Sequence, residues 1–76
     1  MLFQNNEKLE LLDVVAILKA IPENHISIGQ VGTIVEILSP HVYEVEFCNK
    51  KGETIAMISV NGDDLLPLYY DERAVA

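Results

Sequence analysis

The alternation of apolar and polar side chains is clearest in the middle of the chain. Tyr43, Val45 and Phe47 alternate with Glu44 and Glu46. This period of two is typical of an antiparallel strand with one buried and one solvated face. The pattern therefore predicts a strand whose aromatic rings and valine point inward and whose carboxylates point outward.

Similar signals predict three more strands around this one. Residues 31–38 alternate before it, and Ser39-Pro40-His41 predicts the turn between the two. Gly29 and Gly32 permit a sharp bend or a bulge at the start of that segment. After the hairpin turn 49–52, residues 53–60 predict a strand, and residues 61–64 predict a single 3-10 turn before a short last strand over 65–68.

The block LLDVVAILKAI, residues 11–21, fits two kinds of element. As a helix, it would place Leu11, Val14, Val15 and Leu18 on one face, whereas as a strand it would be apolar on both faces. Its β-branched residues and its end at Pro22 favour the strand. Residues 21–28 then read as a loop that returns two isoleucines toward the core.

Five short strands with tight turns and one long loop are the layout of an SH3-like barrel. The prediction is an all-β, SH3-like five-stranded small barrel over residues 11–68, with an N-terminal arm over 1–10 and a C-terminal tail over 69–76. Closure of a small barrel removes the exposed edges that such a sheet would otherwise carry.

The charge of the chain restricts its partners. Twelve acidic residues stand against five basic ones in 76 residues, a net charge of −7. This negative field opposes phosphate backbones and anionic lipid, so we expect no nucleic acid and no membrane as partner. The single cysteine, Cys48, excludes an internal disulfide and fits the reducing cytoplasm. The first residues lack the features of a signal peptide.

Three segments together resemble a known family. They are Asp13-Val14-Val15-Ala16, Gly29 to Glu36 (GQVGTIVE) and Tyr43 to Phe47 (YEVEF). The set is similar to a family of small bacterial proteins, common in cyanobacteria, known as domain of unknown function 4926, and the resemblance covers Leu11 to Leu68. It implies an SH3-like barrel, with no established activity and no catalytic residues. Members are often encoded beside another small protein, which suggests a toxin–antitoxin or immunity pair.

Gly29 to Glu36 is also similar to the short glycine-containing motif of ribosomal and transcription-factor barrels. In those proteins, basic side chains beside the glycine contact phosphates. Here Val31 to Phe47 contains no Lys or Arg. Because affinity for nucleic acid depends mostly on phosphate neutralisation, the charges argue against this function.

The residues that most often carry chemistry show no recognisable spacing. His25 and His41 lie on two different predicted loops, and Cys48 ends a strand. Zinc sites usually show closely spaced ligand pairs, which this chain lacks. We interpret these groups as two surface histidines and a partly buried thiol, and expect no catalytic residue, no metal and no cofactor.

Three carboxylates are the leading candidates for binding. Glu44 and Glu46 are two positions apart and share a strand face, and Glu36 would lie across the hairpin from them. Such a face either keeps the sheet solvated or docks a basic protein partner. A general acid–base pair would need a cleft that the outer wall of a small barrel does not supply.

Apolar residues are in excess in the first third of the chain. Either some of them, near Val15 and Ile17, form an exposed patch, or Leu2, Phe3 and the tail cover them. A homodimer or a dedicated protein partner would account for the excess equally well. Tyr69 and Tyr70 could cover an edge or anchor the tail to a partner. The favoured function is a non-catalytic protein-interaction module; the alternatives are a nucleic-acid- or ribosome-associated barrel and an accessory subunit of a larger enzyme.

Overall fold

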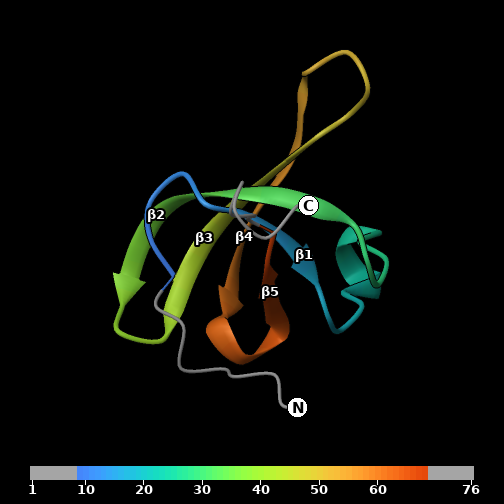
Figure 1. Ribbon diagram of the computed structural model, residues 1–76. Coiled ribbons are helices and arrows are strands. Elements are labelled where there is room, and N and C mark those ends of the chain that lie inside the picture. The colour runs from blue at the N-terminus through green and yellow to red at the C-terminus, as the bar shows by residue number, and fades with distance from the viewer. Residues whose placement is uncertain (1–8, 69–76) are drawn as a thin grey trace, which may run out of the picture.

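The computed structural model describes residues 9–68, and these form five strands and two short 3-10 helices (Figure 1). No α-helix occurs within this range, so the predicted all-β class is confirmed. The elements are β1 (Val14–Ile17), η1 (Pro22–Asn24), β2 (Val31–Ser39), β3 (Val42–Cys48), β4 (Thr54–Asn61), η2 (Gly62–Asp64) and β5 (Leu65–Pro67).

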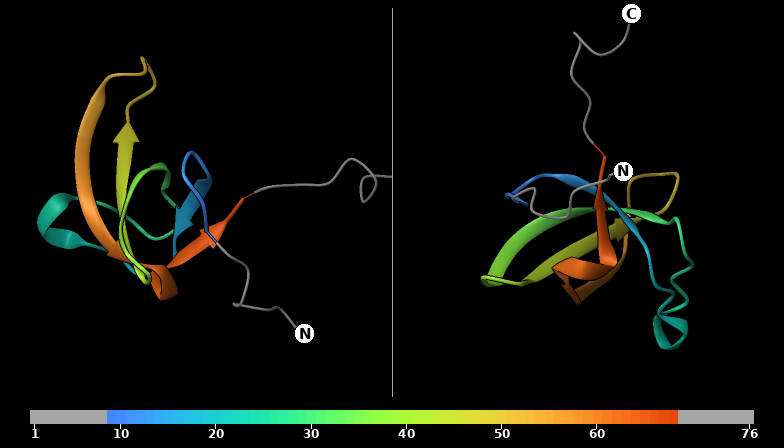
Figure 2. Two further views of the ribbon diagram at one scale, coloured as in Figure 1. Left: turned by 90° about the vertical axis from the view of Figure 1, so that its left-hand side faces the viewer. Right: turned by 60° about the horizontal axis from the view of Figure 1, so that its bottom comes forward.

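The five strands form one antiparallel sheet in the order β4-β3-β2-β1-β5. The sheet is strongly curved, as the two further views show (Figure 2). Its hydrogen-bonded ladder has two ends, with β4 at one and β5 at the other, so the sheet is open. The number of strands and their antiparallel pairing match the prediction, whereas the ladder by itself does not establish the expected closed barrel.

Strand β2 curves along its length, and its register with β3 shifts twice (Figure 1). The shifts fall between Ile34 and Glu36 and between Ile37 and Ser39. Each leaves one extra residue on β2, which is the arrangement of a β-bulge and increases the local twist. Gly29 has a φ of +89° in the turn before β2, so its expected role in a bend is confirmed. Gly32 has a different role, because it allows close packing against β3.

The apolar block at the start of the chain forms β1, and its helical alternative is wrong. The strand covers only Val14–Ile17, since a turn precedes it and Leu12 has a φ of +71° there. The following loop is closed by an isolated bridge between Ile21 and Ile26, and it contains η1, which the sequence did not predict. Ile26 is buried as expected, but Ile28 is 68% exposed.

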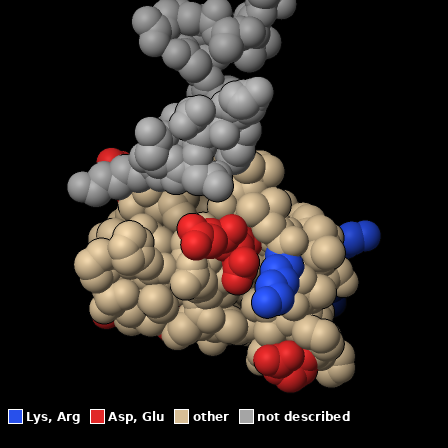
Figure 3. Space-filling view, turned by 90° about the horizontal axis from the view of Figure 1, so that it is seen from below, with Lys and Arg blue, Asp and Glu red and all other residues tan. Residues whose placement is uncertain are grey.

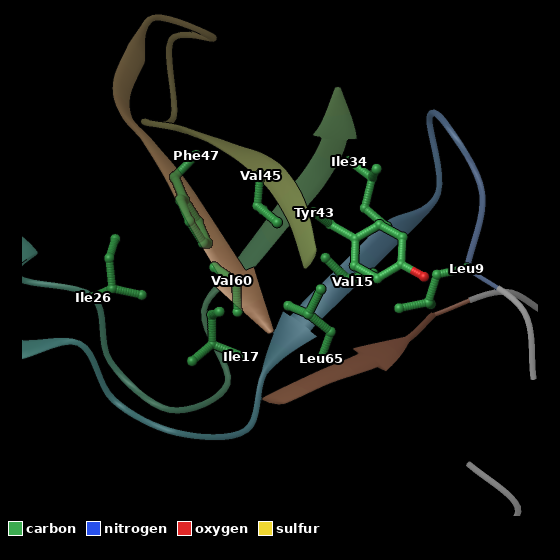
Figure 4. Packing of buried hydrophobic residues seen from close by; sticks show 10 residues of the cluster. All are labelled: Leu9, Val15, Ile17, Ile26, Ile34, Tyr43, Val45, Phe47, Val60 and Leu65. Atoms are coloured by element: carbon green, nitrogen blue, oxygen red, sulfur yellow. The ribbon is translucent and has the colours of Figure 1, made fainter. Parts of the chain in front are cut away.

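The core lies on the concave side of the sheet, where side chains from all five strands meet (Figure 4). Tyr43 is buried as predicted, and its hydroxyl donates to the Pro40 carbonyl at 3.3 Å. Leu9, which lies within the predicted arm, packs into the same core beside Tyr43, so the folded part begins before residue 11. The cluster comprises Leu9, Val15, Ile17, Ile26, Ile34, Tyr43, Val45, Phe47, Val60 and Leu65.

Side-chain hydrogen bonds hold two of the predicted turns. In the β3–β4 hairpin, Asn49 Oδ1 accepts from the backbone N–H groups of Lys51 and Glu53, and Gly52 adopts a φ of +82°. Before β5, Asn61 Oδ1 accepts from the Asp63 N–H at 2.9 Å and caps η2. The predicted 3-10 turn before the last strand is thereby confirmed.

Candidate partner-binding surface

The three candidate carboxylates lie together on the convex face of the sheet. Along β3, Glu44 and Glu46 alternate with side chains that are fully or almost fully buried. Glu36 of β2 is directly opposite Glu44 in the register. Directly opposed residues of an antiparallel pair point to the same side of the sheet. Glu36, Glu44 and Glu46 therefore form one surface, here termed the acidic face, as their spacing predicted.

Hydroxyl groups of the neighbouring strand β4 orient two of these carboxylates. Ser59 Oγ donates to Glu44 Oε1 at 3.4 Å, and Thr54 Oγ1 donates to Glu46 Oε2. Glu44 and Glu46 are half-buried, and Glu36 is exposed. Each of the two bonded carboxylates keeps a second oxygen that can accept a hydrogen bond from another molecule.

The strands that carry or adjoin the acidic face contain no basic side chain. The chain contains no Lys or Arg between Lys19 and Lys50, and β4 contains none either. Strands β2, β3 and β4 therefore carry no fixed positive charge. In addition, Glu36 and Glu44 are like charges at directly opposed positions, an arrangement that destabilises a sheet. A cationic group placed over this face would relieve that repulsion.

The prediction of an exposed apolar patch near Val15 and Ile17 is wrong for these two residues. Both side chains have no exposed surface and belong to the core. The prediction failed because β1 is apolar on both faces, so its pattern did not identify the inner one. The outer face of this part of the sheet instead exposes Val14, Val31 and Leu68. Within residues 9–68, the large exposed apolar side chains are Leu11, Leu12, Val14, Leu18, Ile28, Val31, Ile37, Leu38, Ile55, Met57 and Leu68.

The other candidate residues are dispersed or lie outside the described range. His41 and Cys48 are at opposite ends of β3, and His25 follows η1, so the fold does not bring the three together. Cys48 is exposed rather than partly buried as expected. Within residues 9–68, no three His, Cys, Asp or Glu side chains are arranged to hold a metal ion. Tyr69 and Tyr70 lie outside the described residues.

A pocket of 430 Å³ opens between the long loop and the end of β4. Its walls are residues 19–24 on one side and residues 58–61 with Asp64 on the other. Sequence patterns did not indicate it, since its two walls are far apart along the chain. Seen from below, an acidic group lies beside a basic side chain on a surface that is otherwise mostly uncharged (Figure 3).

Among the described residues, no helix has the length and apolar character needed to span a membrane. The family comparison matches residues 11–67 to the domain of unknown function DUF4926. Because this match covers most of the chain, the protein belongs to that family, as the three sequence segments indicated. Comparisons with curated proteins and with solved structures find no match.

Proposed function

We propose that this protein is a non-catalytic interaction module that binds a basic surface of a protein partner through its acidic face. The observation that carries the proposal is the β2–β3 register, which sets Glu36 opposite Glu44 with Glu46 beside them. No base on β2, β3 or β4 neutralises this cluster. Complementary charge would steer a basic partner to the face and determine its orientation.

The family context supports a specific form of this function, the antitoxin or immunity half of a gene pair. Its mechanism would be occlusion of the partner by charge and shape, with no bond made or broken. We propose an SH3-like barrel for the fold, because the chain order of its strands and the 3-10 turn before β5 match that layout. The exposed thiol of Cys48 fits a cytoplasmic location.

The test is an affinity capture from lysate of the source organism at about 50 and about 200 mM salt, since exposed charge pairs weaken as screening increases. The bait is compared with the double variant Glu44→Lys, Glu46→Lys. We expect the wild-type bait to retain one stoichiometric protein at low salt only, and the variant to lose it. The melting temperature of the variant should stay close to that of the wild type, because these side chains bond only to hydroxyls on the outer face.

Two control variants separate the position of the charges from their number. Glu10→Lys with Glu23→Lys changes the net charge equally at exposed sites away from β2 and β3, and it should retain the partner. Glu44→Gln with Glu46→Gln keeps hydrogen-bond acceptors and removes only charge, so it should lose most of the binding. Capture that is equal for all baits would refute the acidic face as the binding surface. RNA in the eluate without such a protein would favour the nucleic-acid alternative.

A further inference from the structure

The edge strand β4 is long and uncharged, and within residues 9–68 no strand pairs with its outer side. Its eight residues, TIAMISVN, include no Asp, Glu, Lys, Arg or Pro. It pairs only with β3 among the described residues. Met57, which is opposite Glu46 in the register, is on the outer face and 52% exposed, and Ile55, at the register shift between Phe47 and Cys48, is 54% exposed. Proteins normally protect such an edge with charges, proline or short length, because it is a template for pairing with another strand.

The hydrogen-bond pattern between β3 and β4 shows which backbone groups of β4 are free to pair with another strand. Gly62 N–H donates to the His41 carbonyl at 2.8 Å at the end of this ladder. Along an antiparallel strand, successive residues direct their backbone groups alternately to the two sides. Ile58 is four residues before Gly62, so its backbone N–H and C=O groups also point toward β3. Met57 and Ser59 are an odd number of residues from Gly62, so their backbone groups point to the other side. Their N–H and C=O groups therefore point out of the free edge.

The opposite edge of the sheet is much less suited to pairing. Strand β5 has only three residues, Leu65–Pro67. Pro67 has no N–H to donate. The two edges thus differ in length and in the presence of proline, and the open edge is specific to β4.

We propose that β4 pairs with β4 of a second copy of this chain, antiparallel across a two-fold axis at Met57. Such an isologous contact joins the same patch on both protomers, so the uncharged strand meets its own equivalent. Met57 would lie opposite the partner copy's Met57, and Ile55 opposite its Ser59. The Met57 side chains of both copies would then cover one another on the outer face.

Charge complementarity at both ends of β4 supports a second copy of this chain as its partner. Lys50 and Lys51 are seven and six positions before Met57, and Asp63 and Asp64 are six and seven positions after it. The two-fold arrangement therefore brings the lysine pair of each copy to the same end as the aspartate pair of the other. Glu53 at the lysine end offsets one of these positive charges.

The surroundings of β4 also have space for the second strand. The 430 Å³ pocket separates residues 58–61 from the loop 19–24. With the axis at Met57, residues 53–56 of the other copy would lie opposite residues 58–61, beside that pocket. Lys19, Glu23 and Asp64 also line it, so its net charge is negative and suits the incoming lysine end.

The dimer would join two sheets into one with both acidic faces on the same side, because the two-fold axis of an antiparallel pair is perpendicular to the sheet. Each acidic face would flank a central apolar strip from the paired β4 strands. This inference stands independently of the partner proposed above, since it rests on β4 and its two ends.

The test is sedimentation velocity on the full chain at about 5 to about 500 µM, because dimer formation depends on protomer concentration. We expect reversible dimers in the wild type. Met57→Lys should raise the dimer dissociation constant at least about tenfold, since it sets two lysines opposite each other on the edge. Val31→Lys, at a similarly exposed site on β2, is the matched control and should dimerise like the wild type. A wild type that stays monomeric throughout, or a Met57→Lys variant that dimerises fully, would overturn the proposal.

A charge exchange tests the orientation and does not depend on the folding of the Met57 variant. Lys50→Glu with Lys51→Glu, and separately Asp63→Lys with Asp64→Lys, should each weaken self-association. A mixture of the two variants should form heterodimers, because both ends of the antiparallel pair then carry opposite charges again. Failure of the mixture to associate while wild type dimerises would overturn the antiparallel β4 arrangement.

Discussion

Gly32 of β2 lies directly against the ring of Phe47 in β3. A Cβ at Gly32 would be 2.9 Å from Phe47 Cε1 and 2.7 Å from Val45 Cγ1. It would also be 2.9 Å from the Glu46 carbonyl oxygen, which belongs to the backbone. The absence of a side chain at this position therefore allows β2 to approach the core closely where the sheet curves.

Gly32→Ala should lower the free energy of unfolding by about 1–3 kcal/mol, the usual cost of overpacking a core. Urea denaturation measures this change. Val31→Ala is the control, because Val31 is on the outer face and half exposed, and it should change stability by no more than about 0.5 kcal/mol.

Val45→Ala should reduce the cost of Gly32→Ala, because it removes the nearest of the three contacts. A double-mutant cycle gives the coupling between the two positions. The Glu46 carbonyl remains close, so the rescue should be partial. Independent effects of the two substitutions would show that the contact is absent in solution.

A second prediction concerns Leu9, which lies outside the residues matched by the family. It is 7% exposed, and its Cδ1 would be 3.7 Å from a Cβ at Gly62. Leu9→Ala should cost about 2 kcal/mol, the lower part of the range for truncation of a buried leucine. Leu11→Ala, at a position 55% exposed, should cost far less. Equal effects in urea denaturation would place Leu9 outside the core.

Local patterns predicted the strands well where one face is polar. Tyr43 to Phe47 alternates with carboxylates, and both the strand and its inner face were predicted correctly. The acidic face followed from the same alternation plus the hairpin that joins β2 to β3. Such features depend on neighbours in sequence, which a pattern can show.

Features that depend on distant contacts were not predictable in the same way. Val15 and Ile17 were placed on the surface because β1 is apolar on both faces, and only packing decides which face is buried. Leu9 reaches the core through contacts with residues far along the chain. The predicted closed barrel leaves no free edge, whereas the hydrogen-bonded sheet is open and ends at β4.

A third prediction concerns Asn49, which organises the β3–β4 hairpin. Its Oδ1 accepts from Lys51 N–H at 2.8 Å and from Glu53 N–H at 3.0 Å. Its Nδ2 donates to Glu53 Oε1 at 2.8 Å. Asn49→Ala should lower stability by about 1 kcal/mol, a typical net value for exposed turn hydrogen bonds.

Amide hydrogen exchange gives a local measure of the same change. The amides of Lys51 and Glu53 should exchange faster in Asn49→Ala, since both lose their acceptor. Asn24→Ala in η1 is the matched control, because Asn24 is an exposed asparagine that caps no turn. Unchanged exchange at Lys51 and Glu53 would mean that the backbone alone holds the hairpin.

The last prediction concerns Leu12, where a glycine variant should be more stable than an alanine variant. Leu12 has a φ of +71° and is 74% exposed, so its side chain contributes little burial while its backbone is strained. A left-handed conformation costs a non-glycine residue about 1–2 kcal/mol. Leu12→Gly removes this cost but adds entropy to the unfolded chain, about 0.5–1 kcal/mol. Leu12→Ala removes the same apolar surface without relief of strain. Leu12→Gly should therefore be more stable than Leu12→Ala by about 0.5 kcal/mol in urea denaturation, and the reverse order would show that Leu12 is not left-handed in solution.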